Sequence, residues 1–288
     1  MAHTFLMKIR PALLVAAPAS LLLATSPLLV SAARAAPAWA PAASAPIRPG
    51  VMTSTNGGQC TANFVFTDRA GAVYIGQAAH CASTGAATDT DGCTSGTLPL
   101  GTPVQVGGAS RPGSLAYSSW VAMQASGERD PNACASNDFA LVRLDPADVT
   151  RVNPSVPVWG GPTSLGTSTG FGSQVYSYGN SSLRLGISQL SPKTGISLGD
   201  SGGGWTRSVY TVTPGIPGDS GSGFLNSSGQ AVGVLSTLAL APIPASNGVS
   251  DVSRALAYAG THGGPAGLAL VRGTQPFRGT GGILGLLG

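Results

Sequence analysis

The sequence predicts an all-β protein, built as a sandwich or barrel of short strands. Charged residues make up only 9% of the 288 residues, whereas the chain contains 42 glycines and 22 prolines, a composition typical of proteins with many turns. Short β-branched and aromatic runs alternate with Gly, Pro, Asn and Ser, and helical periodicity is scarce. Such runs favour a sandwich or barrel over a parallel α/β sheet.

The first 35 residues have the three parts of a secretory signal. Lys8 and Arg10 are basic, an apolar run extends from 11 to 30, and small residues end the segment at Ala35. A membrane anchor is the alternative, because the run is nearly long enough to span a bilayer. Its three prolines and small-residue end favour cleavage after Ala35. Residues 36–50, rich in Ala and Pro, are expected to form an extended linker or a short pro-piece.

Removal of the signal changes the net charge. The whole chain has 15 Lys and Arg against 11 Asp and Glu, and Lys8, Arg10 and Arg34 lie in the signal, which leaves 12 against 11, or +1. The rest of the sequence has no basic cluster, so neither nucleic acid nor an anionic membrane is supported as a partner. About 250 residues remain, enough for one large domain or two packed subdomains.

The expected strands, in chain order, are 62–67, 72–76, 103–107, 116–124, 139–144, 174–177, 183–188, 208–213 and 231–236. One helix is expected at 251–259, where apolar residues recur at i, i+3, i+4 and i+7. Ser250 or Asp251 would cap its start and Gly260 would end it. An extra strand is expected at 267–271, followed by a mobile Gly- and Leu-rich end.

Four cysteines follow the signal, an even number that indicates two disulfides in an exported chain. Of the three possible pairings, we favour Cys60 with Cys81 and Cys93 with Cys134, because each closes a modest loop and leaves no thiol unpaired. The first bridge would contribute about 3 kcal/mol. A zinc site is the competing interpretation, but the chain has no C-x-x-C pair and only one histidine near the cysteines, so no metal is expected.

Histidine is rare, and only His80 and His262 remain after the signal. A histidine general base would therefore be one of these two. His80 follows an apolar strand and precedes Cys81, whose disulfide would hold the imidazole in place. Asp138 stands at the start of another apolar strand, where a partly buried carboxylate needs a partner such as an imidazole N–H. Taken singly, a lone histidine is usually structural and such an aspartate is usually a turn or cap residue.

A serine flanked by glycines occurs twice. Ser220 lies within Gly-Ile-Pro-Gly-Asp-Ser-Gly-Ser-Gly-Phe at 215–224, and Ser201 lies within Gly-Asp-Ser-Gly-Gly at 199–203. A tight glycine loop exposes the hydroxyl and lets backbone N–H groups point at the group that it attacks. Each serine is therefore a candidate nucleophile.

Together, residues 78–81 (Ala-Ala-His-Cys), 138–142 (Asp-Phe-Ala-Leu-Val) and 218–222 (Gly-Asp-Ser-Gly-Ser) resemble the three signature regions of the chymotrypsin/trypsin-like serine proteases, in particular the secreted bacterial members. The order His, Asp, Ser is that of the family, with spacings of 58 and 82 residues. The resemblance runs from about residue 58 to 260. It implies two packed antiparallel β-barrels with a short C-terminal helix. The expected division is signal 1–35, linker or pro-piece 36–50, protease domain 51–260 and tail 261–288.

The resemblance also implies a secreted, monomeric endopeptidase that acts on proteins or peptides without a cofactor. His80 would act as general base toward Ser220 Oγ, and Asp138 would orient the imidazole. The backbone N–H groups of Gly218 and Ser220 would form the oxyanion hole, worth roughly 3 to 4 kcal/mol per donor. In this family a strand leads into the nucleophile loop and a hairpin leads out, which favours Ser220 and makes Ser201 a glycine loop near the cleft.

Specificity is expected to depend on three substrate-pocket positions. Pro214 stands six residues before the nucleophile, where trypsin-like members carry an acid, and Ser236 and Leu238 lie where many have a pocket-wall glycine after a Ser-aromatic pair. An uncharged, partly filled pocket favours small or apolar side chains over Arg or Lys. The chain has no Ile-Val-Gly-Gly-like start whose amine would pair with Asp219, so we expect an internal donor, although no arginine stands out.

Two other functions are considered. Ser201, Asp251 and His262 follow the Ser, Asp, His order of α/β-hydrolases, as in an esterase. That fold needs a helix after the serine and alternating strands and helices, and the glycines after Ser201 are poor helix formers. A catalytically inactive protease-like binding domain is the other alternative, although all three triad residue types are present.

Overall fold

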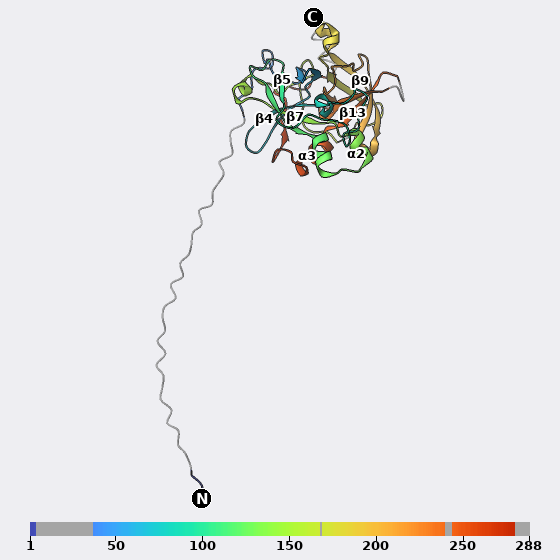
Figure 1. The fold of residues 1–288 in the computed structure, drawn as a ribbon. Helices are drawn as coiled ribbons and strands as arrows, with labels where there is room; N and C mark the ends of the chain where they lie inside the picture. Colours follow the sequence, from blue (N-terminus) through green and yellow to red (C-terminus); the bar gives the residue numbers. More distant parts are fainter. Residues whose placement is uncertain (4–36, 168, 240–243, 280–288) are drawn as a thin grey trace. The chain divides into compact units, whose positions relative to one another are not determined.

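The computed structural model describes residues 1–3, 37–167, 169–239 and 244–279. The chain divides into two units, residues 1–35 and 36–288, and nearly all of the expected signal lies outside the described residues. In the second unit the strands form two antiparallel sheets (Figure 1). The predicted all-β class, with two antiparallel β-layers and a short C-terminal helix, is confirmed.

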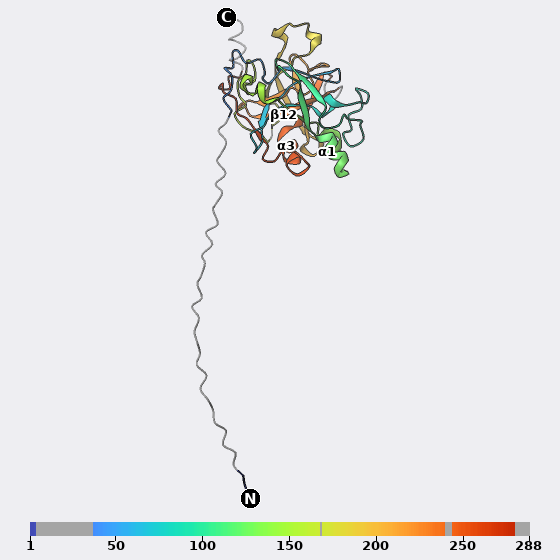
Figure 2. The same cartoon turned by 60° about the vertical axis from the view of Figure 1, so that its left-hand side comes forward.

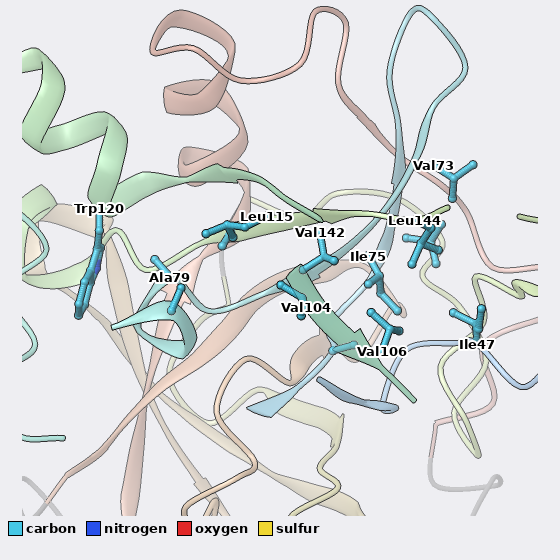
Figure 3. Packing of buried hydrophobic residues seen from close by; sticks show 14 of the residues in the cluster. Ile47, Val73, Ile75, Ala79, Val104, Val106, Leu115, Trp120, Val142 and Leu144 are labelled. Atoms are coloured by element: carbon cyan, nitrogen blue, oxygen red, sulfur yellow. The ribbon is translucent and has the colours of Figure 1, made fainter. Parts of the chain in front are cut away.

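The first sheet has eight strands in the order β14-β3-β4-β7-β6-β5-β1-β2. Their bounds are β1 Met52–Thr55, β2 Gly58–Thr61, β3 Val65–Thr67, β4 Val73–Gln77, β5 Pro103–Val106, β6 Gly113–Ser118, β7 Ala140–Arg143 and β14 Ala269–Leu270. Ile75 on β4, Val142 on β7 and Val104 on β5 are fully buried in one cluster (Figure 3). Because distant strands share this cluster, the sheet curls around a common interior.

The second sheet is a closed barrel in the order β10-β13-β12-β11-β8-β9. Its strands are β8 Gln174–Tyr178, β9 Pro192–Ser201, β10 Thr206–Thr211, β11 Gly223–Asn226, β12 Ala231–Ala239 and β13 Ser246–Asp251. The interior is small and filled by side chains that alternate along the strands, as expected for a narrow barrel: Val175, Val209, Phe224, Val232, Leu235 and Val249.

A layer of aromatic residues joins the two sheets. Phe66 and Phe139 from the first sheet meet edge to face at 5.5 Å, and Trp159 packs on Tyr176 of β8 at 5.1 Å. These four side chains belong to one buried cluster. The cluster also receives the apolar face of helix α3, Val252–Thr261. The two sheets therefore pack through a continuous hydrophobic interface.

Within the described residues, three α-helices lie outside the sheets. Helix α3 contacts α1, Ser119–Ser126, near the base of the molecule in Figure 2, and α2 covers Pro131–Ser136. Asp251 caps α3 through Arg254 N–H, as expected, but the helix continues past Gly260 to Thr261. Short 3₁₀ turns are η1 Ala79–Ala82, η2 Pro146–Arg151, η3 Ser182–Arg184, η4 Ser188–Leu190 and η5 Gly202–Gly204.

Two predicted strands are wrong. In the run expected as strand 116–124, β6 ends at Ser118 and α1 follows, because Trp120 and Met123 bury one helical face and Gly127 ends the helix at φ 66°. The run 183–188 forms 3₁₀ turns and leaves its large apolar side chains exposed. The predicted strand at 267–271 is confirmed in part as β14, which pairs with β3.

The segment 37–50, expected as a linker or pro-piece, packs on the first sheet through Ile47. Ile47 is fully buried in the core of the first sheet. Its N–H donates to Arg151 O, and its carbonyl accepts from Asn153 N–H at 2.9 Å. Burial of this side chain and the backbone hydrogen bonds beside it offset part of the entropy lost when this Ala- and Pro-rich segment is ordered. The expected mobile end, 279–288, lies almost entirely outside the described residues.

The disulfides join Cys60 to Cys81 and Cys93 to Cys134, as expected. The described part of the chain therefore has no free cysteine. Across the same described ranges, no helix is both long and apolar enough to cross a membrane.

Candidate active site

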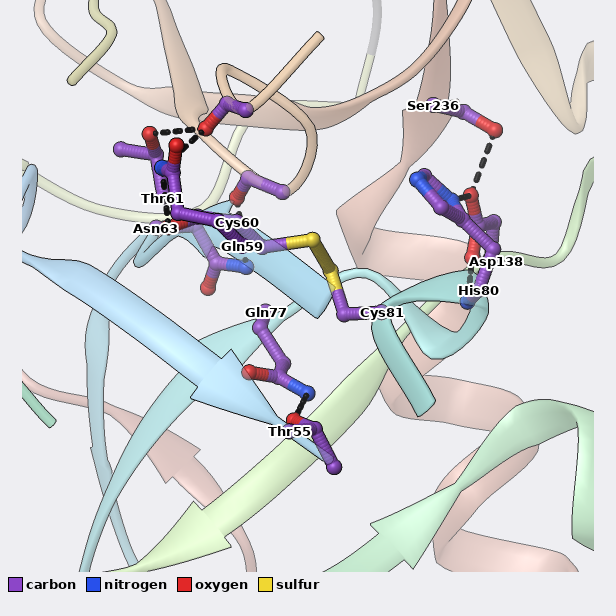
Figure 4. Close-up of a disulfide and its surroundings, with 12 residues drawn as sticks. Thr55, Gln59, Cys60, Thr61, Asn63, Gln77, His80, Cys81, Asp138 and Ser236 are labelled. Carbon is purple, nitrogen blue, oxygen red and sulfur yellow. Dashed lines mark hydrogen bonds and ion pairs between the residues drawn. A yellow bond between two sulfur atoms is a disulfide. The ribbon is translucent and has the colours of Figure 1, made fainter. Parts of the chain in front are cut away.

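Sheet pairing brings His80 and Asp138 together across 58 residues of sequence. Strands β4 and β7 are antiparallel neighbours, with Gln77 opposite Ala140. Because antiparallel neighbours run in opposite directions, the end of β4 and the start of β7 meet at one edge of the sheet. His80 follows β4 in η1, and Asp138 lies two residues before the start of β7. His80 Nδ1 lies 2.6 Å from Asp138 Oδ2, and His80 N–H donates to Asp138 Oδ1 at 2.9 Å (Figure 4).

Each group stabilises the charged form of the other. Burial alone would raise the pKa of the Asp138 carboxyl, but the charge and hydrogen bonds of His80 outweigh it and lower that pKa. Burial likewise would lower the pKa of the His80 imidazole, but the charge and hydrogen bond of Asp138 raise it above its ordinary value. A raised pKa makes the neutral imidazole a stronger proton acceptor. The two contacts with Asp138 fix the orientation of the ring.

Ser236 is the third residue of this cluster. The register of β12 against β13 shifts between Leu235 and Thr237, which marks a β-bulge at Ser236. A bulge re-aims the side chain of the extra residue. Here the Ser236 hydroxyl donates to Asp138 Oδ2 at 2.6 Å (Figure 4). Ser236, expected as a pocket residue, thus lines the cleft and also fixes the carboxylate.

Ser220 lies in the loop between β10 and β11, which docks on the first sheet. Thr61 N–H donates to Ser220 O at 2.8 Å. Gly221 has φ 87°, and a Cβ there would lie 2.6 Å from Thr61 O, so only glycine fits. Ser220 and His80 line one cleft of about 680 Å³. Among the described residues no hydrogen bond joins Ser220 to the imidazole, as is common before substrate tightens such contacts.

The backbone around Ser220 has the features that an oxyanion hole requires. Gly218, with φ 94°, lines the cleft beside Ser220. The N–H groups of Gly218 and Ser220 donate to no other described residue, whereas Asp219 N–H between them donates to Ile216 O at 2.9 Å. These two N–H groups therefore have no acceptor among the described residues, which leaves them free to bind a ligand.

Asp219 is fully buried and is held by two cations that sequence reasoning missed. Arg184 Nη2 lies 2.5 Å and Lys193 Nζ 2.9 Å from Asp219 Oδ2. Burial would raise the pKa of the Asp219 carboxyl, but the hydrogen bond of Arg184 and the charge of Lys193 lower it. The expectation of an internal donor is met by Arg184 and Lys193. Lys193 is the only lysine beyond Lys8, a rarity that was a usable signal.

Of the three expected pocket residues, Ser236 and Leu238 line the cleft and Pro214 does not. Leu238 lines the cleft with 52% of its surface exposed. Pro214 does not line it, because its carbonyl instead accepts from Arg184 and Lys193. Asn247 takes part in the wall although it was not predicted: it is fully buried, and its Oδ1 accepts from Gly215 N–H at 2.8 Å. The side chains of Ser236, Leu238 and Asn247 carry no formal charge, although Asp89 also lines the cleft.

The alternative constellation of Ser201, Asp251 and His262 is not assembled. Ser201 is exposed in the β9–β10 hairpin and, contrary to expectation, does not line the cleft. The Asp251 carboxylate pairs with Arg207. The His262 ring stacks on Tyr258 at 3.8 Å. Each candidate metal cluster within the described residues includes two cysteines that are joined in a disulfide. These cysteines therefore have no thiolate to offer a metal ion.

No protein-family model and no curated protein matches the sequence. Among solved structures, Thermobifida fusca protease A is 18% identical and has a TM-score of 0.48 over 79% of this chain and 99% of that one. A Nocardiopsis protease is 18% identical, with a TM-score of 0.45 over 78% and 98%. Cellulomonas bogoriensis chymotrypsin is 18% identical, with a TM-score of 0.44 over 78% and 98%. The likeness is to bacterial chymotrypsin-like serine proteases and concerns the path of the chain alone.

The Asp219 cluster predicts a large stability effect. Asp219→Asn is expected to lower the free energy of unfolding at pH 7 by about 3 to 5 kcal/mol, because it leaves two buried cations without a counter-charge. Asp200→Asn, the control, removes an exposed partner of Arg207 and should cost less than about 1 kcal/mol. Since the pKa of Asp219 is lowered on folding, its contribution is present above the unfolded pKa and is lost as pH falls through the folded one. Urea unfolding measures both variants, and equal losses would contradict the prediction.

Proposed function

We propose that the protein is a secreted serine endopeptidase that hydrolyses peptide bonds through an acyl-enzyme intermediate. The observation that carries this proposal is the 2.6 Å contact between His80 Nδ1 and buried Asp138, with Ser220 lining the same cleft. Secretion is supported by the signal-like segment 1–35 and by two disulfides, which persist in oxidising compartments. Proteins and peptides are the proposed substrates, and no cofactor is needed.

The residues divide the chemistry as follows. Asp138 holds the Nδ1 side of the His80 ring, which leaves Nε2 to remove the proton from Ser220 Oγ as that oxygen attacks the scissile carbonyl. The carbonyl oxygen becomes negative and accepts hydrogen bonds from Gly218 and Ser220 N–H. The protonated imidazole then gives its proton to the leaving amine. A water molecule activated by the same imidazole hydrolyses the acyl-enzyme.

Mutation separates this site from its competitor. Ser220→Ala and His80→Ala are each expected to lower kcat/KM for a peptide substrate by roughly 10⁴- to 10⁶-fold, because nucleophile and base act as a unit. Ser201→Ala and His262→Ala should leave it unchanged. An organophosphate should label Ser220, as mapped by mass spectrometry. Loss of activity with His262→Ala alone would favour the esterase, and a wild-type chain that neither reacts nor hydrolyses would favour an inactive binding domain.

The activity is expected to fall on the acid side as His80 becomes protonated. Because Asp138 raises the pKa of His80 above its ordinary 6.5, the midpoint of the acid limb of kcat/KM should lie above 6.5. In Asp138→Asn the burial of the ring remains while the negative charge is lost, so the pKa should fall below that of the wild type. NMR titration of His80 in Ser220→Ala and in Ser220→Ala/Asp138→Asn measures both values. A pKa that does not fall in the double variant would contradict this assignment.

Because Ser236, Leu238 and Asn247 in the cleft lining are uncharged, we predict cleavage after small or apolar residues. Profiling on a peptide library should show this preference, and strong preference for Arg or Lys would refute it. Leu238→Gly should widen the cleft and raise kcat/KM for Phe relative to Ala at the cleaved position by roughly 10-fold. Leu185→Gly, which changes an exposed apolar residue outside the cleft lining, is the control and should leave the ratio unchanged.

A further inference from the structure

The direction of the oxyanion donors is set by what holds the carbonyls of the same peptide units. In a trans peptide the C=O and N–H point in opposite directions, and the only cis bond in the described ranges is Gly161–Pro162. Gly218 N–H belongs to the same peptide unit as Pro217 C=O. Whatever binds Pro217 O therefore decides where Gly218 N–H points.

Ser181 is the residue that binds it. The Ser181 hydroxyl donates to Pro217 O at 2.5 Å, and Ser181 N–H donates to Asp219 Oδ1 at 3.0 Å. Its hydroxyl also accepts from Leu183 N–H at 3.1 Å, which fixes the rotamer. Ser181 is buried and does not line the cleft. It therefore contacts the oxyanion loop from behind at two points.

The next peptide unit is held from the opposite sheet. Gly218 O accepts from Thr61 Oγ1 at 2.8 Å and from Gln59 Nε2 at 3.0 Å, both on β2 (Figure 4). Asp219 O, in the unit that supplies Ser220 N–H, accepts from Ser222 N–H at 3.0 Å. The carbonyls of Pro217, Gly218 and Asp219 each accept a hydrogen bond. The N–H groups of Gly218 and Ser220 have no acceptor within the described chain.

We propose that Ser181 is a positioning residue of the oxyanion hole, which aims Gly218 N–H at the reacting carbonyl before substrate binds. Thr61 supports the adjacent peptide unit in the same way. This role rests on the proposed protease function. It does not involve contact with substrate, so its loss should affect the step in which the oxyanion forms and leave ground-state binding intact.

Kinetics on three variants of the full chain test the proposal. Ser181→Ala should lower kcat for a peptide amide by about 10- to 100-fold with KM unchanged, since a misdirected donor is a partial loss of the hole. Ser181→Thr keeps the hydroxyl and should restore most of kcat. Ser182→Ala, which removes the exposed hydroxyl of the neighbouring residue, is the matched control and should behave as wild type.

Inhibitor affinities distinguish positioning from a structural role. A peptide aldehyde, which forms a tetrahedral adduct with an oxyanion, should bind Ser181→Ala more weakly by the same factor as kcat falls. The corresponding peptide carboxylate product should bind as it does to wild type. Equal weakening of both ligands, or a kcat no lower than that of Ser182→Ala, would overturn the proposal.

Two further measurements keep the outcome unambiguous. Thermal unfolding shows whether Ser181→Ala is folded at the assay temperature. If it is not, Thr61→Val, which removes the other hydroxyl donor without changing shape, must show the same loss of kcat at constant KM, and its failure to do so refutes the proposal. If Ser220→Ala is as active as wild type, the protease function itself fails and this role fails with it.

Discussion

The site depends on one backbone contact between the two sheets. At Gly221 the nucleophile loop of the barrel lies so close to the first sheet that a side chain would meet Thr61 O and Ala78 N. Asn63 Nδ2 donates to Gly221 O at 3.1 Å, from the same side. His80 and Asp138 come from the first sheet and Ser220 from the barrel, so this contact helps to set the distance between His80 and Ser220. A methyl group there would separate the two halves of the site.

Burial of charge is the second constraint, both at the site and elsewhere in the fold. The chain has few charged residues, yet Asp138, Asp219 and Asp251 are all buried, and each has a specific partner. An unpaired buried carboxylate would cost several kcal/mol, so each pair must form for the surrounding loops to pack. Asp138 binds His80 and Asp219 holds the loop around Ser220, whereas Asp251 with Arg207 ties β10 to the start of α3. The ion pairs that stabilise these loops therefore also fix the geometry of the site.

Local sequence patterns predicted the apolar core strands and the histidine of the site. Strand β4 and its neighbour β7 have apolar runs that can only be core strands, and His80 was identified because histidines are scarce. Strands β9 and β13 were missed because their sequences are polar and glycine-rich, and pairing partners on both sides hold them in the barrel. The partners of Asp219 were missed because Arg184 and Lys193 reach it only through tertiary packing, although the rarity of lysine was a usable signal for Lys193. Pro214 was misplaced for the same reason, since its carbonyl turns toward those cations.

The hydrogen bonds and ion pairs of Asp219 leave no position for a further cation at its carboxylate. Asp219 Oδ1 accepts from Ser181 N–H, while Oδ2 accepts from Arg184, from Lys193 and from Ile216 N–H. A freed α-amine would have to displace a buried cation to reach this carboxylate, at the cost of leaving that cation unpaired. The oxyanion loop is thus supported from inside the barrel.

Because an α-amine is not needed at Asp219, the N-terminal segment is free for another role. Ile47 fills the core of the first sheet and bonds to the chain at 151 and 153. Removal of residues 36–50 would open a cavity there and cost about 2 to 5 kcal/mol for the one large side chain. The buried side chain and the backbone hydrogen bonds of Ile47 therefore make this segment a contributor to the stability of the fold.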